Sequence, residues 1–380
     1  MNESRTPASR VQVGKPTITT EGVLTVMKLL LTDRISEGEI VNELEIRLAD
    51  MLKAKHAILF NSGHSALVAS YLVAKRIHGC ERAVTTALTF LSTASAAVEA
   101  GLDLVAIDTM PGGFLINADL AERMIRASSK KCVYVPVHLF GYQATDIQGV
   151  FTLQDCCEAF GTGLPDDPVG VPDIGCFSFY TSHVLGCGEL GCAITNSDDD
   201  STMLRKIKDQ GRTFLRPASH VKTGSVASPA LRYSHDTLGY NFRTTDVQAA
   251  LLLGALAELP RVLQARRRVV RRLNDGLAGV PGIRTPRYDE SVSYLAYPIA
   301  CDSPEIRDKL ITGLDEIGVE TRPLMSVIPD EAAVSERIAV PGGYKEAAVI
   351  HRRSLYVSAH DSLSETDMQR IVEGIKGILK

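Results

Sequence analysis

Short apolar runs alternate with amphipathic stretches through the first two-thirds of the chain. The runs are rich in β-branched and aromatic residues, and several end at Gly, Pro or Asp, which is typical of buried strands. We expect strands over residues 56–61, 83–86, 104–108, 133–139, 150–155, 176–180 and 192–195, with helices over 65–78 and 92–100. This alternation predicts an α/β fold with a parallel or mostly parallel sheet, whose ligands bind beyond the carboxyl ends of the strands.

The pattern changes after residue 246, where long helices are expected over 247–259 and 263–277. The proline-flanked segment 281–286 marks a boundary, and a smaller α+β region follows it. Its expected strands span 294–301 and 319–323, and its expected helices span 304–317 and 364–379, the last with Ser364 as N-cap. We therefore predict a large α/β domain over residues 1–260, N-terminal arm included, and a small C-terminal α+β domain over 261–380.

Composition and charge exclude several classes of protein. Of the 380 residues, 45% are hydrophobic and 23% are charged, which excludes disordered, collagenous and coiled-coil chains. The net charge of −4 argues against a nucleic-acid partner, and we interpret the arginines at 266, 267, 268, 271 and 272 as the solvated face of a helix. No apolar run is long enough to span a bilayer, and the first 14 residues lack the apolar stretch of a signal peptide, so we expect a cytoplasmic protein without membrane contact. The eight cysteines form no C-x-x-C pair, which predicts small buried side chains and no metal site.

Three motifs carry candidate chemistry. Residues 186–191 fit G-x-G-x-x-G, but a strand rather than a helix is expected after them, which argues against a dinucleotide site. At 61–67, Asn-Ser-Gly-His-Ser-Ala-Leu joins a strand to a helix, where backbone N–H groups and the Ser62 and Ser65 hydroxyls would hold a phosphate. A plain turn with a serine N-cap explains that motif when it is taken alone. Asp155 ends an apolar run, where it would pair with a protonated ring nitrogen or serve as a cap or turn residue.

The order of these features along the chain resembles a known family. A glycine turn, the aromatic Phe90, the acid Asp155, then Ser178 and a polar residue at position 183 are similar to the pyridoxal-phosphate enzymes of aspartate-aminotransferase fold (fold type I). More narrowly, the chain resembles the DegT/DnrJ/StrS family of nucleotide-sugar aminotransferases and dehydratases. The segments that carry the resemblance are 61–67, 89–96, Gly101 with 105–108, 138–141, 155–161, 178–180, 188–191, 239–243 and 245–250. The resemblance implies a large domain with a mixed, mostly parallel sheet, a smaller C-terminal α+β domain, and a homodimer with shared active sites.

The resemblance also implies a cofactor, pyridoxal 5'-phosphate or pyridoxamine 5'-phosphate, and roles for individual residues. The cofactor-binding set that it implies is Ser62, Gly63, His64, Phe90, Asp155, Glu158, Ser178 and Asn241. In this set Phe90 stacks on the pyridine ring, and Asp155 pairs with the ring nitrogen and keeps it protonated. Asn241 reaches the cofactor phosphate of the neighbouring subunit. At His64 we expect the backbone, rather than the side chain, to contact the phosphate, because the family usually has a small residue or threonine there.

The residue at position 183 departs from the aminotransferase pattern. Aminotransferases of this family have Ser-Phe-x-x-x-Lys, whereas Ser178-Phe179 leads here to His183, and no lysine lies between Lys131 and Lys206. An imidazole cannot form the stable Schiff base that lysine forms with the cofactor, but it moves protons near neutral pH. This departure resembles the pyridoxamine-phosphate-dependent nucleotide-sugar 3-dehydratases, and the acidic Glu158 agrees with that subgroup. The resemblance implies condensation of the cofactor amine with a 4-keto-6-deoxysugar, proton removal by His183 and loss of the C3 hydroxyl.

Two branches of that subgroup differ in an iron–sulfur cluster. Residues 213–234 contain no cysteine, so the cluster-free branch fits better, and it implies glutamate as the amino donor that regenerates pyridoxamine phosphate. Candidate substrate contacts are Arg212, His220, His235 and Arg243. Two alternatives stay open: another pyridoxal- or pyridoxamine-phosphate reaction on a sugar or amine, and a catalytically inactive relative that binds cofactor or sugar.

Overall fold

The computed structural model describes residues 10–33, 35–213 and 234–380. Its larger part is built on two four-stranded sheets with the orders β11-β3-β2-β4 and β1-β7-β6-β5, which β-bridges at Tyr134–Thr152 and Val137–Asp155 connect. The strands are β1 His56–Phe60, β2 Arg82–Thr86, β3 Asp103–Ile107, β4 Cys132–Val135, β5 Leu153–Asp155, β6 Ile174–Ser178, β7 Gly191–Thr195 and β11 Ile338–Ala339. Only β7 runs antiparallel to its neighbours, so the predicted mixed and mostly parallel sheet is confirmed.

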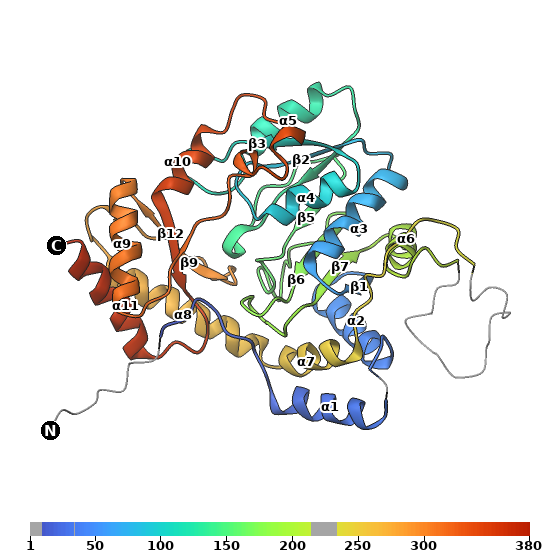
Figure 1. The fold of residues 1–380 in the computed structure, drawn as a ribbon, viewed down its shortest axis with the longest axis horizontal. Coiled ribbons are helices and arrows are strands. Elements are labelled where there is room, and N and C mark those ends of the chain that lie inside the picture. The colour runs from blue at the N-terminus through green and yellow to red at the C-terminus, as the bar shows by residue number, and fades with distance from the viewer. Residues whose placement is uncertain (1–9, 34, 214–233) are drawn as a thin grey trace.

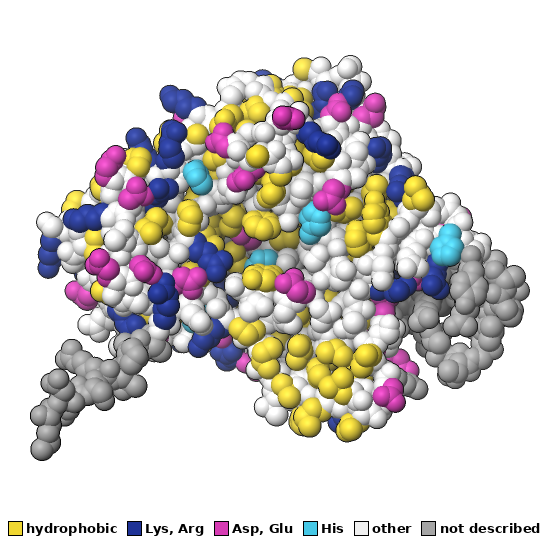
Figure 2. Space-filling view, in the orientation of Figure 1, with side chains coloured by type: hydrophobic (Ala, Val, Ile, Leu, Met, Phe, Trp, Pro, Cys, Tyr) yellow, Lys and Arg dark blue, Asp and Glu magenta, His cyan; other side chains and the backbone are white. Residues whose placement is uncertain are grey.

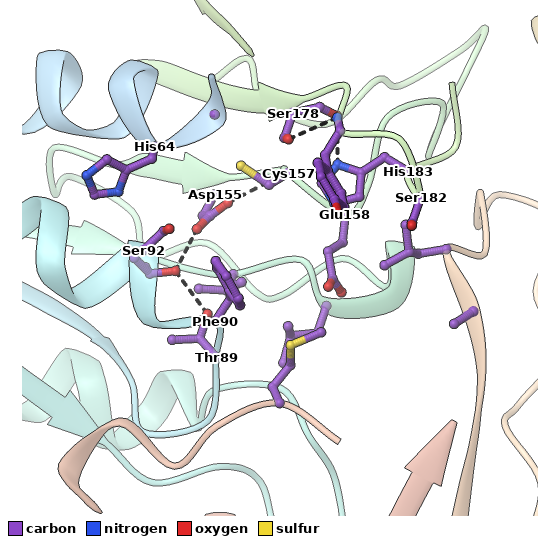
Figure 3. A pocket seen from close by; sticks show the side chains of 18 of the residues that line it. His64, Thr89, Phe90, Ser92, Asp155, Cys157, Glu158, Ser178, Ser182 and His183 are labelled. Atoms are coloured by element: carbon purple, nitrogen blue, oxygen red, sulfur yellow. Dashed lines mark hydrogen bonds between the residues drawn. The ribbon is translucent and has the colours of Figure 1, made fainter. Parts of the chain in front are cut away.

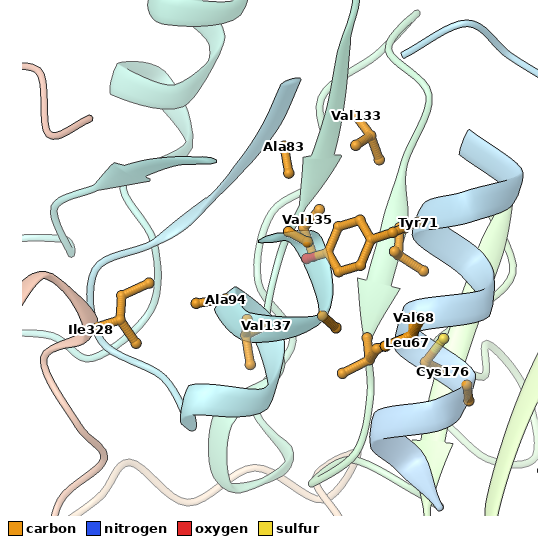
Figure 4. Packing of buried hydrophobic residues seen from close by; sticks show 14 of the residues in the cluster. Leu67, Val68, Tyr71, Ala83, Ala94, Val133, Val135, Val137, Cys176 and Ile328 are labelled. Atoms are coloured by element: carbon orange, nitrogen blue, oxygen red, sulfur yellow. The ribbon is translucent and has the colours of Figure 1, made fainter. Parts of the chain in front are cut away.

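Helices cover both faces of these sheets (Figure 1). They are α1 Thr20–Leu31, α2 Glu39–Met51, α3 Gly63–Arg76, α4 Leu91–Glu99, α5 Ala118–Ala127, α6 Asp198–Lys208 and α7 Asp246–Leu256. The buried helix α3 packs Leu67, Val68 and Tyr71 against β-strand residues such as Val135 and Cys176 (Figure 4). The Tyr71 hydroxyl donates to the Thr93 carbonyl at 2.9 Å, so α3 also fixes the position of α4. This packing holds the starts of two helices beside the carboxyl ends of the strands.

A smaller antiparallel sheet of order β10-β12-β9-β8 lies beside the large one. Its strands are β8 Ile283–Arg284, β9 Ala296–Cys301, β10 Arg322–Pro323 and β12 Ser354–Ser358, and its helices are α8 Leu259–Leu277, α9 Pro304–Glu316, α10 Lys345–Arg353 and α11 Glu365–Ile378. Ser364 caps α11 as expected, since its hydroxyl accepts from the Asp367 N–H and the Asp367 side chain accepts in return. The division at 260/261 stays a prediction. Contacts cross it: β11 pairs with β3, for example, and the Val11 N–H donates to the Gly318 carbonyl at 2.9 Å.

Several expected elements differ from the observed ones. The strand expected over 133–139 ends at Val135, before Pro136, and a single turn of 3-10 helix spans Leu139–Gly141. The strand expected over 319–323 is reduced to Arg322–Pro323. Helices α1, α2, α5, α6 and α10 were not expected. Within the described residues, no helix combines the length and apolar character needed to cross a bilayer.

The basic run on α8 is a correction to the sequence interpretation. Arg268, Arg271 and Arg272 are exposed, as a solvated helix face requires. Arg266 is instead only 1% exposed, so the interpretation is wrong for this residue. Its guanidinium donates to the backbone carbonyl groups of Tyr294, Leu295 and His183, which take the place of water as hydrogen-bond acceptors.

Candidate active site

A cavity of about 390 Å³ lies where the carboxyl ends of the large-sheet strands face the small sheet. The starts of α3 and α4, the ends of β5 and β6, and the loop before β7 form most of its wall. Leu295, Arg322 and Tyr356 close it from the smaller part of the molecule. Figure 3 shows His64, Phe90, Asp155, Glu158, Ser178 and His183 gathered around this space. The cavity is therefore at the edge of the sheet where an α/β fold presents its ligand site.

The start of α3 forms one end of the cavity. Ser62 is its N-cap, and its hydroxyl accepts from the Ser65 N–H at 3.1 Å. Gly63 allows close approach, because a Cβ atom at this position would lie 2.7 Å from the Ser178 Cβ and 3.1 Å from the Cys157 Sγ. The first N–H groups of a helix lack intrahelical acceptors and attract anions. Together with the Ser178 hydroxyl, this end of the cavity suits a phosphate group.

His64 also faces the cavity from the first turn of α3. Its Nε2 lies 3.3 Å from Glu99 Oε1 at the end of α4, so its side chain is engaged by a neighbouring acid. The contact of the His64 backbone, rather than its ring, with a phosphate stays a prediction.

Asp155 stands at the centre of the cavity wall. It is only 4% exposed, at the end of β5, and its Oδ2 accepts from the Thr93 hydroxyl at 2.7 Å. Its Oδ1 accepts from the Cys157 N–H at 3.2 Å, which is the local turn bond expected of an aspartate in a turn. These two bonds fix the carboxylate while it lines the cavity, so the turn role is compatible with contact to a ligand. Beside it the Phe90 ring is 64% exposed, which leaves a bare aromatic wall for a planar ligand.

Glu158 presents a protonated carboxyl group to the same space. Burial, with a smaller contribution from the Asp155 charge, raises its pKa to about 8. Its Oε2 accepts from the Phe140 N–H at 2.7 Å, and Phe140 adopts a left-handed backbone conformation with φ of 57°. At neutral pH the carboxyl group can therefore donate a hydrogen bond to a ligand as well as accept one.

His183 presents its imidazole to the cavity. Its Nδ1 lies 3.0 Å from the Ser178 carbonyl oxygen, which can only accept, so Nδ1 carries the proton and Nε2 keeps its lone pair. Burial, with the charge of Arg266 in addition, lowers the pKa of His183 to about 4. The imidazole is therefore neutral at physiological pH. Among the described residues that line the cavity there is no lysine, so none is placed to form the Schiff base that a histidine cannot form.

The other sequence-predicted candidates lie outside this cavity. Asn241 is exposed on the segment that passes Asn61, where the Phe242 carbonyl accepts from the Asn61 N–H at 2.9 Å. Arg212 and Arg243 both pair with Asp209, and His235 forms a β-bridge with Arg212. His220 lies outside the described residues.

Sequence reasoning about the site missed the small-sheet residues of the wall. Arg322, on β10, is the cation that lines the cavity within the described part of the chain. Its side chain is 48% exposed and pairs with Glu320 at 3.2 Å. No motif in the sequence pointed to a place for this residue in the cavity wall.

Comparison with known proteins identifies the family. The sequence pattern of the DegT/DnrJ/EryC1/StrS aminotransferase family matches residues 16–376. The chain belongs to this family. Family membership confirms the predicted resemblance and the type I fold, and it makes the protein one of a group that depends on pyridoxal or pyridoxamine phosphate.

Relatives within the family differ in their reactions. A GDP-perosamine synthase of Caulobacter vibrioides is 27% identical over 97% of this chain and 98% of its own. A dTDP-4-dehydro-2,6-dideoxy-D-glucose 3-dehydratase of Saccharopolyspora spinosa is 26% identical over 90% of this chain and 80% of its own. A solved GDP-4-keto-6-deoxymannose-3-dehydratase with bound GDP-perosamine shares the fold, with a TM-score of 0.86 at 18% identity over 97% of this chain and 100% of that one.

The cavity of this DegT/DnrJ/EryC1/StrS family member fits the cofactor of the family. A phosphate fits the end formed by α3, where the space at Gly63 admits no side chain. A cationic ring nitrogen fits the fixed Asp155 carboxylate, and a flat ring fits the bare face of Phe90. The chemistry of each donor thus matches one part of the group. Among the described residues no group of His, Cys, Asp and Glu side chains is placed to hold a metal ion.

Proposed function

We propose that this protein is a pyridoxamine-phosphate-dependent 3-dehydratase of a nucleotide-linked 4-keto-6-deoxysugar. The observation that carries the proposal is a histidine, His183, in the cavity where the aminotransferases of the family have lysine. Its neutral ring and its fixed tautomer suit proton transfer, and it offers no amine for covalent attachment of the cofactor.

The proposal assigns the cofactor to residues of the cavity wall. Ser62, Gly63 and His64, by their place at the start of α3, and Ser178 would hold its phosphate. Phe90 would cover one face of the ring, and the Asp155 carboxylate would hold a proton on the ring nitrogen. When bound, pyridoxamine phosphate supplies an amine that condenses with a ketone and a ring that accepts electrons.

The chain's own residues carry the proton transfers. His183 Nε2 would take a proton from the carbon that bears the cofactor amine, while the Ser178 carbonyl keeps Nδ1 protonated and the ring in place. The imidazolium formed in this way would then give the proton to the departing C3 hydroxyl. Glu158, protonated and anchored at the Phe140 N–H, would orient the ligand by a hydrogen bond.

Arg322 supports a substrate that carries an anionic group. The nucleotide diphosphate of the sugar and the carboxylates of glutamate, the proposed amino donor, both offer such a group. The GDP- and dTDP-sugar names of the relatives agree with a nucleotide-linked sugar and leave the base open. Arg212, His220, His235 and Arg243 remain proposed substrate contacts.

We propose a homodimer in which Asn241 completes the site of the second subunit. One surface supports it: α1 leaves Leu24, Met27, Leu30 and Leu31 at least half exposed, as a yellow patch at the bottom of Figure 2. An apolar face of this size suits a second copy of the chain. Helix α1 is seated firmly on α7, because a Cβ atom at Gly254 would lie 2.6 Å from the backbone N of Gly22. Analytical ultracentrifugation of a Leu24→Ser/Met27→Ser variant should show monomer, and an unchanged sedimentation coefficient would contradict this interface.

Incubation with pyridoxamine phosphate, glutamate and a panel of GDP-, CDP- and dTDP-4-keto-6-deoxysugars tests the reaction by mass spectrometry. Loss of one oxygen from a sugar, with 2-oxoglutarate formed, is the expected result and identifies the nucleotide. A 4-amino sugar would instead show transamination, the reaction to which the name of the perosamine synthase relative points. Bound cofactor without turnover of any of these sugars would contradict the substrate class and favour the open alternatives, a different substrate or an inactive relative.

A further inference from the structure

Arg266 connects two walls of the cavity from behind. It lies on α8, is 1% exposed, and donates from Nη1 to the carbonyl oxygens of Tyr294 and Leu295, each at 3.0 Å. Its Nη2 donates to the carbonyl oxygen of His183 at 3.3 Å. His183 and Leu295 both line the cavity, on opposite parts of the molecule. One buried guanidinium thus joins the loop that carries His183 to the segment that leads into β9.

This guanidinium has no carboxylate in hydrogen-bond contact among the described residues. Asp361 contributes a favourable charge but pairs with Arg261 at 2.9 Å. Burial lowers the pKa of Arg266 to about 10, so the group is still cationic at neutral pH. A buried charge held only by backbone carbonyls is costly to a fold, and a neutral side chain would fill the same space without that cost. The charge therefore calls for a role beyond packing.

We propose that Arg266 is the positioning residue of His183: its guanidinium fastens the His183 loop to the segment that leads into β9 of the small sheet, and its charge opposes protonation of the imidazole. This inference rests on the proposed role of His183 as the base. The groups that act on the imidazole from the elements around it are the Ser178 carbonyl on β6, Asp155 on β5 and Arg266 on α8. Burial is the main cause of the lowered pKa of His183. The Ser178 carbonyl and Asp155 favour the protonated ring, so Arg266 is the charge that adds to burial in keeping the ring neutral.

Two variants separate the two parts of the proposal. Arg266→Gln keeps an N–H donor and removes the charge, whereas Arg266→Lys keeps the charge and loses the fork that reaches three carbonyls. Arg267→Gln is the matched control, because Arg267 is on the same helix and donates from Nε to the Val292 carbonyl at 3.2 Å, without contact to His183. Nothing in the proposal places Arg267 in the binding or catalytic machinery.

The readout is the titration of His183 in the full-length protein without added ligand, followed by NMR of labelled histidine and assigned with a His183→Asn variant. We expect the pKa of His183 to rise by about one pH unit in Arg266→Gln, the size of shift that a nearby charge causes, and to stay unchanged in Arg266→Lys and Arg267→Gln. The acid limb of kcat/KM should move with it in Arg266→Gln. Arg266→Lys should lower kcat several-fold without moving that limb.

An unchanged His183 titration in Arg266→Gln would overturn the electrostatic part, and wild-type kcat in Arg266→Lys would overturn the fastening part. If Arg266→Gln does not fold, Arg266→Lys still decides, since a His183 titration at its ordinary value in that variant would contradict the role of the charge. The NMR titration needs no turnover. A failed dehydratase assay with the expected titration shifts would therefore refute the reaction and leave the coupling between the two side chains in place.

Discussion

Replacement of His183 by asparagine tests the proposed base most directly. The His183 ring donates from Nδ1 to the Ser178 carbonyl at 3.0 Å and offers Nε2 to the cavity. The amide N–H of asparagine can take over the first interaction, while no atom replaces Nε2. The loop should therefore keep its place and the cofactor should still bind, because the phosphate end, Asp155 and Phe90 are untouched.

The expected loss of rate follows from the number of proton transfers that depend on Nε2. A positioned acid or base contributes about 10²–10⁴-fold to a rate, which corresponds to about 2.7–5.4 kcal/mol of activation free energy. In the proposed reaction the same nitrogen removes one proton and delivers it to the leaving hydroxyl. We therefore expect kcat of His183→Asn to fall by about 10³–10⁴-fold, near the upper end of that range.

Single-turnover dehydration, with the protein preloaded with pyridoxamine phosphate, measures this loss by mass spectrometry of the sugar. Fluorescence titration measures the affinity for the cofactor, which should stay within about threefold of the wild-type value. His351→Asn is the matched control, because the His351 Nδ1 also donates to a backbone carbonyl, that of Met325 at 2.9 Å, and the residue is not part of the cavity wall. A His183→Asn variant with near wild-type kcat would refute the assignment of the base.

Three further predictions concern other groups. The free energy of unfolding of Glu158→Gln, measured with urea, should rise relative to that of wild type as the pH is raised from 5 to 8. Folding raises the pKa of the Glu158 carboxyl group to about 8, so the wild-type protein loses stability over this range, whereas glutamine does not titrate. A difference that stays constant with pH would contradict this. Asp108→Ala should lower the free energy of unfolding, measured with urea, by about 1–2 kcal/mol, because Asp108 accepts from the Glu346 and Ala347 N–H groups at 2.9 and 2.8 Å at the start of α10. The control Asp275→Ala, at an exposed position, should change it by less than about 0.5 kcal/mol. Arg322→Gln should raise KM for the sugar or for glutamate about 10- to 100-fold, because a hydrogen bond to a charged group contributes about 1.5–3 kcal/mol. An unchanged KM for both substrates would show that Arg322 does not contact either of them.

The central sheet could be predicted from sequence because its strands are buried on both faces. Continuous apolar runs such as 57–60 and 104–107 stand out in a polar surrounding, and Asn61 and Asp108 follow them directly. Strands at the edge of the fold have no such signal. β10 and β11 contain two residues each, and their pairing depends on the segments that β12 and β3 place beside them.

The candidate site could be predicted as far as it is built from residues at strand ends and helix starts. Gly63, Asp155 and Ser178 each follow or end a recognisable strand, so the parallel sheet brings them to one edge. Arg322 and Tyr356 come from the small sheet, and they reach the cavity only because that sheet packs against the large one. No local pattern in the sequence encodes such a docked arrangement.

Arg266 shows how two sequence signals can disagree at one residue. The apolar positions of α8, at Val262, Val269 and Leu273, place residue 266 on the buried face by helical periodicity, whereas its charge and its charged neighbours favour exposure. Periodicity determines the outcome here because the Tyr294, Leu295 and His183 carbonyls accept from Nη1 and Nη2 of the guanidinium, although its buried Nε has no partner among the described residues. An arginine at a buried position of an amphipathic helix therefore indicates hydrogen-bond acceptors, here backbone carbonyls, in the core. In this chain one of those acceptors, the His183 carbonyl, belongs to the loop of the proposed base, so the residue that departs from the apolar pattern of α8 also leads to the candidate site.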